Sequence, residues 1–395
     1  MALPTTEPTF QRLSAEETML ALPAAGVVDI PCPEPRGGPR DVLERILRDA
    51  LTDTPCYVLF SGGRDSSALL ALATHVARRE GLPLPVPVTA RYPEAPETDE
   101  TSWQELVLEH LRLPEHVVLE VRGEERLLSD VATGALRRHG VLWPEAVQLH
   151  GGRYRHLGAG AVISGEGGDM VVNGHRMAAL RAALAMHRPR RRTLRAGARA
   201  VLPASVTRAL VAQRVTAAVP PWLRPPMAGR YVEQITAMQT DPLRWDVATR
   251  ASIRKRYMDL LFTNFAASIS EYGARSVNPF VSPELVEALA RAGGPVGWGD
   301  RTDIFRRLFG DVLPDAVLAR SSKAVFNATR WGADERDFAR SWDGAGVDEA
   351  VIDLERLRAE WLSDDPHPAA DFLLHVAWAG SERLPVGGLP PGPDT

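Results

Sequence analysis

The chain has 395 residues, of which 45% are hydrophobic and 24% charged, and its formal net charge is −4. This composition indicates a soluble globular protein of one large or two medium domains. The longest apolar stretch near the N-terminus, residues 19–30, lacks a basic flank and contains Pro23 and Asp29, which argues against a signal peptide and a membrane span, so the expected compartment is the cytoplasm. Two cysteines, Cys32 and Cys56, fall short of a disulfide framework or a zinc site.

The first half of the chain alternates predicted strands with predicted helices. Residues 1–40 form a Pro-rich N-terminal extension, and helical spacing of apolar residues begins at residues 41–50. Short apolar runs predict strands over residues 56–60, 86–90, 117–121 and 161–164, and helical patterns follow over residues 68–79, 98–111 and 124–139. Such alternation predicts an α/β fold with a doubly wound parallel sheet over residues 41–175, and ligands at the carboxyl ends of its strands.

Beyond about Asn173 the strand signals fade, and a mostly helical C-terminal half is expected. Helical patterns cover residues 177–185, 205–218, 242–272, 283–292 and 301–308. We divide this half into an arginine-rich helical insertion (residues 176–240), a helical portion (residues 241–385) and a Gly/Pro-rich tail (residues 386–395) that is expected to be disordered.

The charges are distributed unevenly along the chain. Between Met170 and Val232 there are twelve arginines and no Asp or Glu, so this segment carries about +12 and the remainder about −16. Such a split indicates a surface for an anionic partner, for example an acidic peptide or a carrier protein. The alternative is a solvated or partly disordered insertion without a ligand.

A glycine- and serine-rich turn follows the first predicted strand: Ser61-Gly62-Gly63-Arg64-Asp65-Ser66-Ser67. A turn of this kind before a helix offers backbone N–H groups and a positive helix end to a phosphate, with the serine hydroxyls as further donors. It is neither a Walker A loop nor a dinucleotide-binding GxGxxG motif. Because a phosphate repels a neighbouring carboxylate unless a cation bridges them, Asp65 predicts Mg²⁺. The alternative is a helix cap with Asp65 as the capping residue.

A second glycine turn follows the strand predicted over residues 161–164: Ser164-Gly165-Glu166-Gly167-Gly168-Asp169. Gly165 and Gly167 leave room for a nucleotide beside the backbone, and Asp65 and Asp169 are expected to share one Mg²⁺ on its pyrophosphate. Taken alone, this turn is also compatible with a plain acidic turn.

Together these segments resemble the asparagine synthetase-type members of the PP-loop ATP pyrophosphatases. Residues 61–66 resemble the SGGxDS loop of that family, and residues 164–169 resemble its SGEGxDE segment. Three further stretches are similar in the same order: an acidic stretch at residues 97–100, Arg275-Ser-Val-Asn-Pro-Phe280, and a run over residues 304–326 that contains Lys323. The resemblance covers roughly residues 40–335.

The resemblance implies ATP-dependent activation of a carboxylate as an acyl-adenylate, release of pyrophosphate, and attack by an amine to form an amide. It implies that Mg²⁺ is held by Asp65 and Asp169, and that pyrophosphate is cradled by Ser61, Gly62, Gly63, Ser66 and Ser67. It assigns Lys323 to charge stabilisation and Glu166 to proton removal from the amine. The alternative for Lys323, one of two lysines in the chain, is an ordinary surface residue.

Several departures from the family pattern place substrate recognition in question. Arg64 adds a cation near the nucleotide, Met170 replaces a Glu, and Val281-Ser282 replaces Leu-Asp. Residue 2 is Ala2 and not the cysteine of a glutaminase domain, so the amine is expected to come from solution, from the substrate or from a partner.

These features favour an amide synthetase of specialised metabolism, similar to β-lactam synthetases and the macrolactam cyclases of lasso peptides. Two alternatives are a PP-loop enzyme that modifies a nucleic acid and a nucleotide-binding subunit without catalysis of its own. The ten histidines show no metal-binding spacing, and His150 is expected to be a surface or packing residue.

Overall fold

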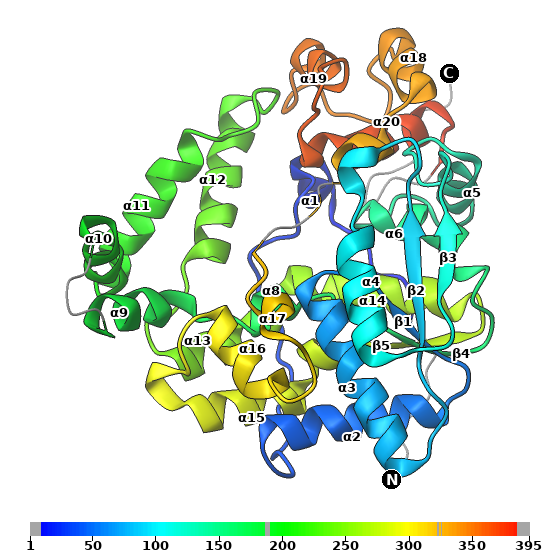
Figure 1. The fold of residues 1–395 in the computed structure, drawn as a ribbon. Coiled ribbons are helices and arrows are strands. Elements are labelled where there is room, and N and C mark those ends of the chain that lie inside the picture. The colour runs from blue at the N-terminus through cyan, green and yellow to red at the C-terminus, as the bar shows by residue number, and fades with distance from the viewer. Residues whose placement is uncertain (1–8, 186–189, 322–323, 325, 385–395) are drawn as a thin grey trace.

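The protein is built around one five-stranded parallel sheet (Figure 1). The structure is a computed structural model that describes residues 9–185, 190–321, 324 and 326–384. The strands lie in the order β3-β2-β1-β4-β5, with bounds β1 (Cys56–Leu59), β2 (Val86–Arg91), β3 (Val117–Glu120), β4 (Gly160–Ile163) and β5 (Ala274–Val277). The predicted α/β class with a doubly wound parallel sheet is confirmed.

Helices connect the strands and build the second half of the chain. In the first half these are α1 (Ala15–Leu20), α2 (Pro39–Thr52), α3 (Arg64–Glu80), α4 (Thr101–Leu111), α5 (Asp130–His139), α6 (Ala146–Leu149), α7 (Gly151–Tyr154) and α8 (Gly168–Val171). The second half contains α9 (His175–Ala185), α10 (Arg191–Ala200), α11 (Ala204–Thr216), α12 (Pro225–Gln239), α13 (Trp245–Ile253), α14 (Arg256–Ser270), α15 (Pro283–Gly293), α16 (Arg301–Phe309), α17 (Asp315–Leu318), α18 (Ala333–Ser341), α19 (Leu354–Trp361) and α20 (Pro368–Ser381). Short 3-10 turns are η1 (Pro96–Thr98), η2 (Pro279–Val281), η3 (Gly294–Val296) and η4 (Asn327–Arg330). Within the described ranges, no helix combines the length and the apolar composition needed to cross a bilayer.

Buried side chains form a separate core on each face of the sheet. The larger core packs α2, α3, α15 and α16 against the sheet through residues such as Leu43, Leu69 and Phe305. On the other face, Tyr154 of α7 and Ile269 of α14 pack against strand residues. A third core gathers α1, α5 and α18–α20 into a helical layer. The interior strand β4 is buried along its whole length, as is typical of a parallel sheet covered on both faces.

The structure departs from the predicted elements in three places. β5 lies inside the half expected to be helical, because Arg275 and Ser276 interrupt its apolar pattern at the edge of the sheet. The helix predicted over residues 124–139 starts at Asp130, where the Ser129 hydroxyl caps it by accepting the N–H of Ala132 at 3.2 Å. The pattern over residues 242–272 forms two helices, α13 and α14, with a break between Ile253 and Arg256.

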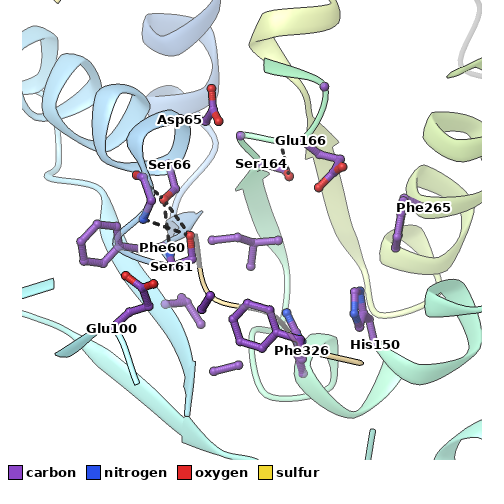
Figure 2. Close-up of a pocket in the computed structure, with 18 of the residues that line it drawn as sticks. Phe60, Ser61, Asp65, Ser66, Glu100, His150, Ser164, Glu166, Phe265 and Phe326 are labelled. Carbon is purple, nitrogen blue, oxygen red and sulfur yellow. Dashed lines mark hydrogen bonds between the residues drawn. The ribbon is translucent and has the colours of Figure 1, made fainter. Parts of the chain in front are cut away.

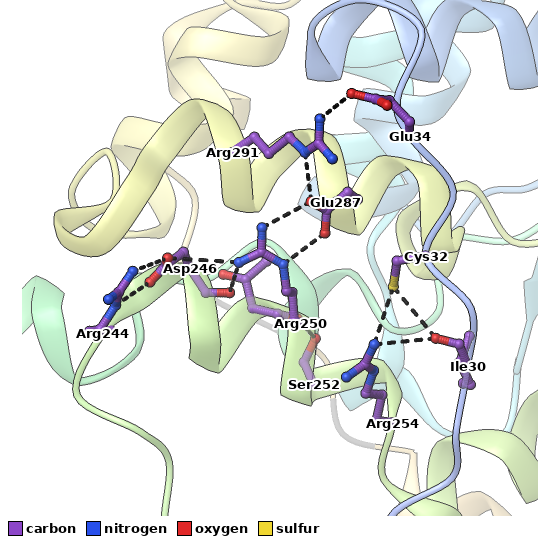
Figure 3. Close-up of polar contacts among 11 residues, drawn as sticks. Ile30, Cys32, Glu34, Arg244, Asp246, Arg250, Ser252, Arg254, Glu287 and Arg291 are labelled. Carbon is purple, nitrogen blue, oxygen red and sulfur yellow. Dashed lines mark hydrogen bonds and ion pairs between the residues drawn. The ribbon is translucent and has the colours of Figure 1, made fainter.

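A network of ion pairs ties the N-terminal segment to α13 and α15 (Figure 3). Glu287 of α15 accepts hydrogen bonds from Arg250 of α13 at 2.7 Å and from Arg291 at 2.7 Å, and Arg291 also pairs with Glu34 at 2.7 Å. Hydrogen bonds from the guanidinium of Arg250, with a smaller contribution from Arg291, lower the pKa of Glu287 to about 2. These contacts fasten the segment before α2 to the helices that cover the sheet.

The helices α9–α12, which we call the arginine arm, lie along one side of the molecule (Figure 1). The two ends of the arm meet at Asp241. Its carboxylate pairs with His175 at 3.3 Å and accepts a hydrogen bond from Lys255 at 3.4 Å, while its carbonyl accepts one from Arg176 at 3.3 Å. At its far end the arm bridges to the helical layer, where Leu223 pairs with Ile352.

Candidate active site

The two glycine turns meet because they follow neighbouring strands. β1 and β4 pair in parallel, with Cys56 opposite Ala161, so the turns leave the sheet at the same edge. A Cβ atom on Gly165 would lie 3.0 Å from the backbone N of Ser66, and one on Gly168 would lie 2.3 Å from Oδ1 of Asp65. A side chain at Gly168 would therefore displace the Asp65 carboxylate.

The first turn has the geometry of an anion cradle. Gly62 has a φ of 79°, a conformation that favours glycine. The N–H of Gly63 donates to Oγ of Ser61 at 3.2 Å, and the hydroxyls of Ser61 and Ser66 lie 3.2 Å apart (Figure 2). No side chain caps the N-terminus of the 17-residue helix α3, so its first N–H groups and its positive dipole end are open to a phosphate.

Two carboxylates stand at this cradle. The Asp65 side chain forms an ion pair with Arg301 at the start of α16. Burial raises the pKa of Asp65; Arg301 opposes this shift, and the nearby Asp169 carboxylate adds to it. Mg²⁺ is commonly held by one or two carboxylates together with phosphate oxygens. Asp65 and Asp169 fit that donor set, and the described residues contain no group of three or more acids, histidines or cysteines that would bind a metal without the nucleotide.

Two arginines that sequence reasoning did not single out contact the first turn. Arg301 pairs with Asp65, and Arg320, which is 6% exposed, donates to the carbonyl of Gly62 at 2.7 Å and pairs with Glu100. The guanidinium of Arg320 also lies 4.6 Å from the ring centroid of Trp103. Arg320 therefore joins the cradle to α4 and to the segment that carries Lys323. The only sequence signal was their place in or beside the run at residues 304–326.

Arg64 turns toward α16 and α17. Its Nη1 donates to Oγ1 of Thr302 and to the carbonyl of Leu318, both at 3.2 Å, and its guanidinium lies 5.3 Å from the ring of Phe305. The expected extra cation near the nucleotide is thus engaged in packing at the rim of the cavity.

A cavity of about 550 Å³ opens in front of both turns. Phe60, Val88 and Ala90 line it beside the strand ends, and His150, Tyr154 and Phe265 line it elsewhere. Figure 2 shows Ser61 and Ser66 on one side of this cavity and His150 and Phe265 across from them, with Glu166 between. The cavity therefore extends from the serine turn to the side that His150 and Phe265 line.

The side across from the serines is aromatic and holds a buried ion pair. The ring of His150 stacks on Phe265 with centroids 5.6 Å apart, a packing contact in the wall of the cavity. Burial, followed by the charge of Arg153, lowers the pKa of His150 to about 3, so its imidazole is neutral at pH 7. Glu125 is paired with Arg153 and accepts a hydrogen bond from the Tyr92 hydroxyl at 2.6 Å.

A family profile for asparagine synthase matches residues 39–374, which is most of the chain. The chain belongs to the asparagine synthase family. A search of curated proteins finds no similar sequence. Asparagine synthase membership makes the protein a ligase that uses ATP to form an amide bond.

Most of the predicted site residues of this asparagine synthase family member line the same cavity: Ser61, Gly63, Asp65, Ser66, Gly165, Glu166, Gly167 and Asp169. Gly62 contributes through its turn and its carbonyl. Ser67 is fully buried and does not line the cavity, so its side chain does not reach a phosphate in this arrangement. Lys323 lies outside the described residues.

Proposed function

We propose that the protein adenylates a carboxylate with ATP and Mg²⁺, releases pyrophosphate and passes the acyl group to an amine. The observation that carries this proposal is the meeting of Asp65 and Asp169 at the uncapped end of α3, next to the serine turn. This arrangement suits a pyrophosphate group with a bridging cation. Mg²⁺ would neutralise charge on the departing pyrophosphate.

We assign a separate role in this reaction to each group of site residues. Ser61, Gly63 and Ser66, with the first N–H groups of α3, would hold the pyrophosphate in place, and Asp65 and Asp169 would hold Mg²⁺ on it. Arg301, which pairs with Asp65, would add positive charge beside the phosphates. Lys323 remains our candidate for stabilising charge on the acyl transition state.

The amine and the activated carboxylate would bind on the His150 side of the cavity. Glu166 lies between the serines and His150, and it is our candidate for the base that accepts a proton from the amine (Figure 2). The neutral ring of His150 and the ring of Phe265 would exclude water from the acyl-adenylate. Most of the cations in this wall are paired with acids, so the wall suits a largely apolar or aromatic substrate group.

We place this reaction in specialised metabolism, with a small carboxylic acid or a peptide as the substrate and an amide or macrolactam as the product. The departures at Met170 and at Val281-Ser282 support a substrate other than aspartate. Val281 packs against Gly167, which lines the cavity, so the departure at Val281 lies directly behind the cavity wall.

The test is an ATP–pyrophosphate exchange assay with Mg²⁺ and a panel of carboxylic acids and peptides, with AMP and ADP separated by chromatography. We expect exchange and AMP formation that depend on one class of acid and that Asp65→Asn abolishes. Asp315→Asn is the matched control, because this exposed acid pairs with Arg306 on the surface. Formation of ADP, or ATP binding without exchange for any acid, would contradict the proposal, and the latter result would favour a nucleotide-binding subunit.

A further inference from the structure

The arginine arm combines exposed apolar side chains with uncompensated charge. Five of the eleven large apolar side chains that are exposed in the described structure lie on α9, α10, α11 or their connecting turn: Leu184, Leu194, Val201, Val206 and Leu210. The segment around them has no acidic residue. Exposed apolar residues that gather in one region mark an interaction surface more often than scattered ones do.

On helix α10 the arginines and the exposed apolar side chains lie along separate edges. Its buried residues, Gly197 and Ala200, mark the side turned toward the protein, and a Cβ atom on Gly197 would lie 2.6 Å from Cβ of Ala183 in α9. At 3.6 residues per turn, residues four apart share a face. One solvent edge therefore carries Arg191, Arg195 and Arg199, and the adjacent edge carries Leu194, Ala198 and Val201.

The arginines of the arm fall into two groups, those whose side chains have described partners and those whose side chains have none. Arg176 donates to the carbonyl of Ala200 at 2.6 Å, which links α9 to α10 within the arm, and Arg181 donates to that of Gly297 at 3.2 Å, which ties the arm to the turn after α15. By contrast, the structure shows no hydrogen bond or ion pair to a described residue for these exposed side chains: Arg190, Arg191, Arg192, Arg195, Arg199 and Arg208.

Like charges four residues apart destabilise a helix by about 0.2–0.5 kcal/mol per pair. α10 carries two such pairs in succession, Arg191 with Arg195 and Arg195 with Arg199. An anionic partner along this edge would remove the repulsion.

The partner must match both edges. A nucleic acid would satisfy the arginines but not the apolar edge, and α9–α11 carry no Trp, Tyr or Phe on which a base could stack, while the ring of His175 is buried against Asp241. The same lack of Trp and Phe disfavours insertion into a membrane surface. An amphipathic helix with acidic residues on one edge and apolar residues on the next matches both.

We propose that α10 and the start of α11 form a docking surface for an acidic amphipathic helix of a partner protein or peptide. Arg191, Arg195 and Arg199 pair with its carboxylates, while Leu194, Val201 and Val206 contact its apolar edge. The inference does not depend on the proposed adenylation, because docking needs neither ATP nor catalysis. The arm begins shortly after Asp169 in the chain, so a partner bound to the arm is connected through α9 to the segment that forms the active site.

The test uses a labelled synthetic peptide of about 18 residues, five turns of helix, with Glu and Leu on adjacent edges. Its binding to the full chain is followed by fluorescence anisotropy at about 0.15 M salt, where exposed charges act only over about 8 Å. We expect micromolar binding that weakens at least tenfold with the triple change Arg191→Glu, Arg195→Glu and Arg199→Glu, and also with Leu194→Ser. The control triple, Arg112→Glu, Arg138→Glu and Arg155→Glu, changes exposed arginines elsewhere by the same charge and should bind normally.

Three comparison probes give the outcomes that overturn the proposal. A peptide of the same composition with scrambled order should bind at least tenfold more weakly. Equal binding of the two peptides would mean that the surface attracts negative charge without recognising a helix. A single-stranded RNA, or phosphatidylglycerol vesicles, that binds through the same arginines while the amphipathic peptide does not would assign the surface to another class of partner. Circular dichroism of each variant checks that the arm remains helical.

Discussion

The buried pair of Glu125 and Arg153 allows a sharp prediction for the substrate side of the cavity. Glu125 is 5% exposed, and it accepts hydrogen bonds from two nitrogens of Arg153, one of them at 2.5 Å, and from Tyr92 at 2.6 Å. Burial favours the protonated acid, but the charge and hydrogen bonds of Arg153 prevail and hold the pKa of Glu125 at about 2. Glu125→Gln would therefore remove a full charge at pH 7 and leave the guanidinium without its anion.

Breaking a buried ion pair on one side costs about 3–5 kcal/mol. The side chain of Arg153 is 20% exposed to the cavity, so the lower end of that range, about 3 kcal/mol, is expected. The matched control is Glu120→Gln, because Glu120 pairs with Arg122 and both side chains are more than half exposed. An exposed pair contributes about 0–1 kcal/mol.

Urea denaturation at pH 7.5, followed by fluorescence and circular dichroism, would measure both variants. The reasoning is refuted if Glu125→Gln loses no more stability than Glu120→Gln. A double variant that adds Arg153→Met to Glu125→Gln should recover part of the loss, because the unpaired buried cation is then removed.

Three further changes test other parts of the structure. Gly168→Ala should push the Asp65 carboxylate aside and lower pyrophosphate exchange on the order of a hundredfold, whereas Gly134→Ala in α5, where a Cβ atom meets only an ordinary contact at 3.5 Å, should keep activity. Arg320→Lys should weaken ATP binding, measured by calorimetry, at least tenfold, because an ammonium group cannot reproduce the paired guanidinium bonds; unchanged affinity would mean that the cradle does not need Arg320. Burial and then the nearby Glu145 raise the pKa of Asp371 to about 7, so its contribution to stability is complete below about pH 4, the pKa of an unfolded Asp, and is lost as the pH rises through about 7. Asp371→Asn should flatten this pH dependence and stabilise the protein at pH 8 by up to about 4 kcal/mol. If the free energies of unfolding of the parent protein and the variant changed with pH in parallel, the raised pKa of Asp371 would be contradicted.

The four strands predicted from the sequence are short runs of mostly apolar residues between polar turns. The four predicted strands match β1–β4 to within about one residue at either end. β5 was missed because it lies at the edge of the sheet and presents Arg275 to solvent, where that residue pairs with Asp53 at 3.0 Å. A periodic pattern of apolar residues arises from burial. An edge strand of four residues buries too few side chains to show such a pattern.

The same limit applies to the active site. Glycine turns at strand ends are local signals, and they led to Asp65, Glu166 and Asp169, whose catalytic roles remain predictions. The partners of these turns come from distant parts of the chain: Arg301 reaches Asp65 across 236 positions, and Arg320 reaches Glu100 across 220. Residues so far apart in the sequence form no local pattern, so only the three-dimensional arrangement reveals these pairs.

The closure of the arginine arm at Asp241 has a consequence for how such proteins could diversify. Because His175, Arg176 and Lys255 meet at one residue, the chain leaves the body and returns to it at nearly the same point. The exposed face of α10 lies between this closure and the second contact of the arm, at Leu223 and Ile352, so its charge can change without shifting Asp169. Under the proposed docking role, changes confined to this face would alter partner choice and leave the two glycine turns in place.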